Sequence, residues 1–258
     1  MPKILKKEKL FQFLIFVIIL VILSLSCMYL EVSPLELVIS LPDFLVFFVT
    51  RFLPPDFSQW QNFLPQVLDT VFFAIIATYI STIFAALFGL LMSELVNPFR
   101  WLRNFLRIIV SFFRNIPVMI WASLLVYAFG VGELVGLIAL VIATIGFLSR
   151  SYADSINELD RKNLECIKAV GGSPLQVLWH GTLVLFKPSL INWTLYCFEL
   201  NIRSSAILGM VGAGGVGVLI QTSIKLFDYQ TACGLIIIVI LMVLLSELVT
   251  NKIREKVM

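Results

Sequence analysis

The sequence predicts an all-α membrane protein of about six transmembrane helices. Of its 258 residues, 60% are hydrophobic and 14% are charged, whereas a soluble domain has about 45–50% apolar and about 25% charged residues. The apolar residues gather into six long runs, and most basic residues lie in alternate stretches between them. A single globular core cannot cover this much apolar surface, so we expect a lipid environment.

The six apolar runs are each long enough to cross about 30 Å of hydrocarbon as a helix. In lipid, every backbone N–H and C=O needs a partner within the protein, and a helix supplies it. The runs cover approximately residues 10–30, 67–92, 104–129, 133–156, 186–208 and 231–250.

The first run follows a lysine-rich start, as a signal peptide does. It is about twenty residues long, which is enough to span, and it lacks a clear cleavage site with small residues. We therefore interpret residues 1–30 as a cytoplasmic tail with a retained transmembrane helix.

Residues 31–66 are expected to form an extracytoplasmic segment with helices lying in the membrane interface. Ser33 followed by Pro34 and Glu36 is typical of a helix start, with an N-cap, a proline at the first position and an acidic first turn. Several phenylalanines and prolines follow, which suits short interfacial helices. Residues 67–258 then form the core membrane domain.

The distribution of basic residues predicts the orientation. Fourteen of the nineteen Lys and Arg residues lie on the side of the N-terminus if the six runs alternate, and only Arg51 and Lys225 lie on the other. Cytoplasmic loops carry this excess, so both termini are expected in the cytoplasm.

The polar stretch between the fourth and fifth runs has helix signals at both ends. Gly171 and Gly172 end a short helical pattern, and Ser173 with Gln176 forms a capping box that starts another helix. A loop punctuated in this way should hold a fixed shape. An amphipathic helix held there suits docking into a groove of a partner.

This stretch resembles the E-A-A-x-x-x-G loop of bacterial ABC importer permeases, with Glu165 and Gly171 in the matching positions. Ile167 stands where the family has its second alanine, and the usual downstream Leu-Pro is Leu183-Val184. The resemblance implies a coupling helix at about residues 160–175 that contacts an ATPase subunit. Its candidate residues are Glu165, Cys166, Lys168, Ala169, Gly171 and Gly172.

Two further segments are similar to the phosphonate-type permeases of this superfamily. They are residues 198–204, which read FELNIRS, and residues 211–217, which read VGAGGVG. The resemblance implies the transmembrane domain of a type I importer in the bacterial cytoplasmic membrane. It also implies a homodimer with two ATPase subunits and an extracytoplasmic binding protein, and a phosphonate or related phosphorus oxyanion as substrate.

Charged residues inside a span are costly and are expected to face a partner or a wet cavity. Glu199 and Arg203 are four residues apart, so they either pair on one helical face or line the translocation path. The candidate path residues are Glu199, Asn201, Arg203 and Ser204.

The glycines of residues 212–217 have the spacing of a dinucleotide-binding fingerprint but not its structural context, because no strand precedes them. They are expected to allow close backbone approach, or to let a loop bend as the pore opens. The gating or hinge residues are Gly212, Gly214, Gly215 and Gly217.

Other functional classes receive less support. No Walker A motif is present, so the chain itself is not expected to be an enzyme, and ATP and Mg²⁺ would bind the partner ATPase. One histidine and scattered cysteines predict no metal site or bound cofactor, and a net charge of +3 does not favour nucleic acid. The remaining alternatives are a permease for another solute, such as an amino acid, and an ion-coupled secondary transporter.

Overall fold

The computed structural model describes residues 2–257, with the side chains of residues 2–7, 10, 34, 37, 161 and 257 left out of the description. All regular elements in this range are helical, which confirms the all-α prediction. The chain divides into two compact units, Met1–Pro54 and Pro55–Met258.

The first unit holds α1 (Pro2–Tyr29), α2 (Pro34–Phe47) and a π-helical turn, η1 (Phe48–Phe52). The apolar stretch Phe11–Tyr29 is long enough to cross a membrane, and none of it is buried within the protein. The predicted start of α2 is confirmed, because the Ser33 side chain accepts a hydrogen bond from the backbone N–H of Glu36.

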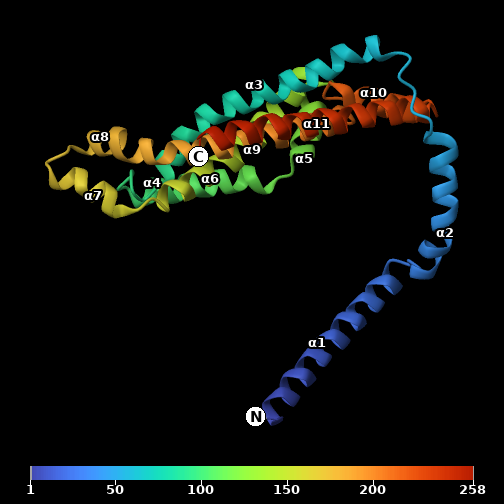
Figure 1. Cartoon of the computed structure of the whole chain (residues 1–258), viewed down its shortest axis with the longest axis horizontal. Coiled ribbons are helices and arrows are strands. Elements are labelled where there is room, and N and C mark those ends of the chain that lie inside the picture. Colours follow the sequence, from blue (N-terminus) through green and yellow to red (C-terminus); the bar gives the residue numbers. More distant parts are fainter. Residues whose placement is uncertain (1, 258) are drawn as a thin grey trace. The chain divides into compact units, whose positions relative to one another are not determined.

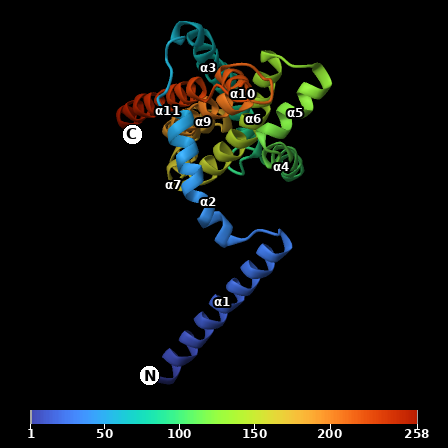
Figure 2. The same ribbon diagram turned by 90° about the vertical axis from the view of Figure 1, so that its right-hand side faces the viewer.

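The second unit is a bundle in which α3, α6, α9 and α11 lie side by side (Figures 1 and 2). Small residues let these helices approach closely. A Cβ on Gly89 of α3, for example, would lie 2.7 Å from the Cβ of Tyr152 on α6. The elements are α3 (Trp60–Met92), α4 (Arg100–Asn115), α5 (Val118–Phe129), α6 (Glu133–Asn157), α7 (Arg161–Ala169), α8 (Pro174–Gln176), the π-helix η2 (Val177–Thr182), α9 (Leu183–Gly209), α10 (Val216–Lys225) and α11 (Tyr229–Val257).

Four helices of the described chain are long and apolar enough to span a membrane, or five if a bent pair is counted as one span. They are α1, α3, α6 and α11, and the bent pair is α4 with α5. Helix α9 has 27 residues, but polar side chains such as Asn192, Glu199 and Asn201 make it less apolar. Six spans and cytoplasmic termini therefore stay predictions.

The expected third span, residues 104–129, is not one straight helix. Helices α4 and α5 meet at an angle of 85°. Pro117 causes the break, because a proline disfavours helical backbone in the residue before it, and Ile116 has ψ of 118°. Large apolar side chains of α4, among them Trp101 and Ile108, are exposed, whereas Arg103 is buried and donates to the carbonyl of Asn97 at 2.7 Å.

Candidate functional site

The predicted glycine turn after α7 is confirmed. The backbone N–H of Gly171 donates to the carbonyl of Lys168 and that of Gly172 donates to the carbonyl of Ile167, both at 3.0 Å. This pair of bonds is the Schellman arrangement that ends a helix, and it needs a left-handed residue, which Gly171 supplies with φ of +83°.

The helix after the turn begins with the predicted capping box. The backbone N–H of Ser173 donates to the Gln176 side chain, and the Ser173 hydroxyl accepts from the backbone N–H of Gln176. At the other end of α7, the Asp160 carboxylate accepts from the backbone N–H of Lys162 at 3.0 Å. Residues 160–176 are therefore fixed at every helix end by local hydrogen bonds.

One face of α7 is anchored on η2. Leu164 is 5% exposed. A Cβ on Gly181 would lie 2.8 Å from Cδ2 of Leu164 and 2.9 Å from Cδ1 of Ile167, so the glycine leaves room for both side chains. Helix α7 thus has a buried apolar face, and its position relative to the long helix that continues through α9 is determined by packing.

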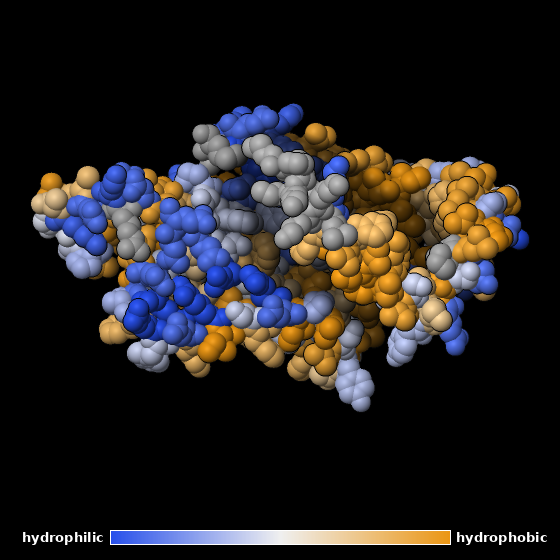
Figure 3. Space-filling model, turned by 90° about the horizontal axis from the view of Figure 1, so that it is seen from below, coloured by the Kyte–Doolittle hydropathy of each residue, from blue (hydrophilic) through white to orange (hydrophobic). Residues whose placement is uncertain are grey.

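The other face of α7 is open. The side chains of Glu165, Cys166, Lys168 and Ala169 are exposed. Large apolar side chains are exposed beside them, among them Val170 at 85%, and this surface lies at the tip of the bundle (Figure 1). Hydrophilic side chains gather at the same end of the second unit (Figure 3). Exposed apolar residues in such a polar region indicate a surface for a protein partner.

The nearby ends of α3 and α6 are joined by polar contacts that the sequence analysis did not identify. The Asn157 side-chain carbonyl accepts from the Ser93 hydroxyl at 2.9 Å and from the backbone N–H of Glu94 at 2.8 Å. Arg107 lies 3.4 Å from the Glu94 carboxylate. The two contacts of Asn157 connect residues more than 60 positions apart, so no local sequence pattern predicts them.

Of the two alternatives for Glu199 and Arg203, the structure does not form the ion pair between them. The Glu199 carboxylate instead accepts from Nη2 of Arg254 at 2.8 Å and from the Thr250 hydroxyl, both on α11. Arg203 is exposed and has no hydrogen bond or ion pair with any residue the structure describes. Glu199 pairs with Arg254 and not with Arg203 because the packing of α11 on α9 brings this second arginine to its carboxylate.

Asn201 does not accompany Arg203 on an exposed face. It is 4% exposed, its amide nitrogen donates to the Thr78 hydroxyl at 2.9 Å, and its carbonyl oxygen accepts from the Thr144 hydroxyl at 2.8 Å. Asn201 therefore joins α3, α6 and α9 inside the bundle in this conformation. Ser204 is half-buried.

The glycine-rich segment is closely packed. Gly212, Gly214 and Gly215 have positive φ angles between 74° and 88°. A Cβ on Gly217 would collide with the carbonyl oxygen of Ala206 and lie 2.9 Å from Cα of Gly209. The expectation of close backbone approach is thus confirmed, whereas bending of this loop during transport stays a prediction.

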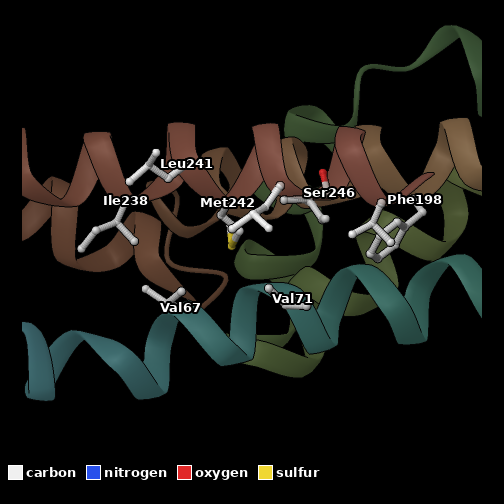
Figure 4. Close-up of a pocket in the computed structure, with 10 residues that line it drawn as sticks. Val67, Val71, Phe198, Ile238, Leu241, Met242 and Ser246 are labelled. Carbon is white, nitrogen blue, oxygen red and sulfur yellow. The ribbon is translucent and has the colours of Figure 1, made fainter. Parts of the chain in front are cut away.

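A further hollow, of about 450 Å³, lies between α3, α9 and α11. Figure 4 shows that almost only apolar side chains line it, among them Val67, Phe198 and Met242. The hydroxyl of Ser246 is already used, because it donates to the carbonyl of Val243. An oxyanion would find no cation or free donor among these side chains, so we do not assign this hollow as the substrate site.

Residues 85–256 match the profile of the family described as "Binding-protein-dependent transport system inner membrane component". The chain belongs to this family. It is accordingly the permease subunit of an importer and lies in the bacterial inner membrane. The match includes α7, the glycine-rich segment and both partners of the Glu199–Arg254 ion pair.

Individual relatives are similar over most of the chain. The phosphite transport system permease protein PtxC of Stutzerimonas stutzeri is 29% identical over 203 residues, which are 79% of this chain and 74% of that protein. The phosphate-import permease protein PhnE of Mycolicibacterium smegmatis is 33% identical over 80% of this chain, and the match spans only 39% of that protein.

Solved structures share the fold. An inward-facing structure of the MetNI methionine ABC transporter has a TM-score of 0.66 and 20% identity, and covers 74% of this chain and 94% of that chain. The similarity confirms the architecture of an ABC importer permease.

Proposed function

We propose that this permease forms the pore of an ATP-driven importer whose cargo is a phosphorus oxyanion: phosphite, a phosphonate or phosphate. Three named relatives support this cargo, namely PtxC, the mycobacterial PhnE and an Escherichia coli PhnE2 described as a cryptic phosphonate permease, which is 35% identical over 119 residues. Arg203 is exposed and pairs with no carboxylate in the described part of the chain, which suits an anionic cargo.

The transporter would contain two copies of this chain, two ATPase subunits that bind ATP and Mg²⁺, and an extracytoplasmic binding protein. A two-fold axis would place two copies of Arg203 around one pore. Binding in the pore must be weak enough for the anion to leave again.

The observation that carries the proposal is the construction of α7. Its inner face is anchored through Leu164 and its ends are fixed by capping, while Glu165 and Lys168 are exposed on its outer face. Such a helix can transmit a rigid-body movement of a docked ATPase to η2 and α9, to which it is attached. A flexible loop would absorb that movement.

An amino acid is the second candidate cargo, because the methionine permease MetP of Bacillus subtilis is 28% identical over 57% of this chain. An amino acid at neutral pH carries an ammonium group that favours a carboxylate partner. Glu199 is the acidic side chain in the second half of α9, and Arg254 and Thr250 occupy it. This arrangement favours the anion.

Uptake measurements test the proposed cargo against the second candidate. The assembled transporter is supplied with labelled phosphite, phosphate, methylphosphonate and methionine. We expect uptake of at least one phosphorus anion and none of methionine. Methionine uptake without uptake of any phosphorus anion would contradict the proposed cargo.

Two substitutions test the coupling role of α7. Glu165→Arg reverses an exposed charge, and Gly171→Val places a β-branched residue at a φ of +83°, which it strongly disfavours. We expect both to abolish uptake and co-purification of the ATPase. Glu255→Arg, an exposed change near the end of α11, is the control and should preserve both. If the variants of α7 keep both properties, this role is wrong.

A further inference from the structure

Glu199 is held from α11 by more than one contact. Its carboxylate accepts from Arg254 at 2.8 Å and from Thr250, and the side chains of Glu199 and Arg254 are only 15% and 19% exposed. Arg254 is itself oriented, because its Nη1 donates to the Asn251 side-chain carbonyl at 2.9 Å. The negative charge of Glu199 is thus paired by a residue 55 positions away.

Arg203 lies one helical turn from this pair. Residues four apart on a helix are neighbours, and a glutamate before an arginine at this spacing normally attracts it. Here the guanidinium of Arg203 is exposed and makes no bond to the residues described, although Glu199 is within reach along the helix. The competing contact to Arg254 explains why.

We propose that Arg254 is a positioning residue that neutralises Glu199 and thereby keeps Arg203 available for the anionic substrate. This inference rests on the proposed cargo. If Arg254 were neutral, Glu199 would have Arg203 as its nearest cation on α9, and the resulting pair would cancel the attraction for an anion. An unpaired Glu199 carboxylate would repel the anion directly.

A simpler role would be that of a structural link between α9 and α11. The two roles differ in their dependence on Arg203. A structural link is weakened by loss of either partner, whatever residue stands at position 203. The positioning role makes the loss of Arg254 harmful only while both Glu199 and Arg203 are present.

A stability cycle tests the positioning role without any substrate. The thermal midpoints of the full chain in lipid nanodiscs are compared for Glu199→Gln, Arg203→Gln and the double variant. In the native chain we expect the two shifts to add. In an Arg254→Gln background we expect them not to add, because Glu199 and Arg203 then pair. Additive shifts in both backgrounds would overturn the proposal.

Uptake of the phosphorus anion by the assembled transporter gives the second test. Arg254→Gln should lower the rate by about tenfold or more, and Arg254→Lys, which keeps the charge, should largely preserve it. Glu199→Gln should restore uptake to Arg254→Gln but not to Arg203→Gln. Lys252→Gln, which removes an exposed cation from the same end of α11, is the matched control and should have little effect.

The outcomes separate this inference from the proposed cargo. If the native transporter carries none of the phosphorus anions, the cargo is wrong, and the stability cycle still decides whether Arg254 keeps Glu199 away from Arg203. If the anion is carried but Glu199→Gln restores both arginine variants or neither, the cargo stands and the role of Arg254 falls.

Discussion

Replacing Gly217 by alanine separates packing from bending in the glycine-rich segment. On helix propensity alone, alanine would stabilise α10 by about 1 kcal/mol relative to glycine. The structure opposes this gain, because the new Cβ would collide with the carbonyl oxygen of Ala206 and lie 2.9 Å from Cα of Gly209 and 3.0 Å from the backbone nitrogen of Met210.

All three atoms belong to the backbone of α9 or the residue that follows it, so no side chain can rotate out of the way. Overpacking in a core costs about 1–3 kcal/mol, and contacts between two backbones belong at the upper end. The net loss is therefore about 2 kcal/mol, which corresponds to a decrease of about 4–8 °C in Tm for a chain of this size.

The assay is the thermal midpoint of the purified chain in lipid nanodiscs, with anion uptake by the assembled transporter measured in parallel. Gly132→Ala is the control, because a Cβ there meets no atom within 4 Å and its φ of 172° is extended backbone. Its midpoint should change by less than about 2 °C. If Gly217→Ala keeps the native midpoint but loses uptake, bending rather than packing explains this glycine, and the reasoning is refuted.

Two further changes test other parts of the second unit. Asn201→Ala should lower the free energy of unfolding by about 1–3 kcal/mol, because the Thr144 hydroxyl loses its acceptor and the Thr78 hydroxyl loses a donor in the interior; an unchanged Tm would contradict this. The pKa of Asp56 lies below its ordinary 3.8 because the backbone N–H and then the hydroxyl of Ser58 donate to its carboxylate. The two hydrogen bonds from Ser58 to the ionised Asp56 carboxylate therefore stabilise the native state fully above pH 3.8, and this contribution is lost as the pH falls through the lowered pKa. Hydrogen exchange of the Ser58 backbone amide, corrected for intrinsic rates, should accelerate as Asp56 becomes protonated. Asp56→Asn should remove this pH-dependent acceleration, and an identical acceleration in that variant would contradict the assignment to Asp56.

The sequence predicted the shape of residues 160–176 well because that shape depends on local interactions. A glycine with positive φ and a Ser–Gln capping box each act within six residues, so the pattern of residue types contains the information. The start of α2 at Ser33 was predictable for the same reason. Whether α7 contacts an ATPase is a separate question, which depends on a second molecule.

The features that the sequence did not reveal depend on a proline inside an apolar run or on contacts between distant segments. The third apolar run was interpreted as one span from its length and hydropathy, and these do not show the 85° bend that Pro117 produces between α4 and α5. Glu199 was given Arg203 as one possible partner because only the spacing along one helix was visible. The choice of Arg254 depends on how α9 and α11 pack, which no local pattern encodes.

The polar residues of α9 thus perform different tasks within a few positions of one another. Asn201 faces the interior and holds three helices together, Glu199 is neutralised by α11, and Arg203 remains exposed. Successive helical residues point about 100° apart, so one short polar stretch can serve packing, charge compensation and an open surface at once. On the proposed placement of Arg203 in the pore, its positive charge depends on α11 as much as on α9. Transport of an anion should therefore respond to substitutions near the C-terminal end of α11, far along the chain from the arginine that would meet the substrate.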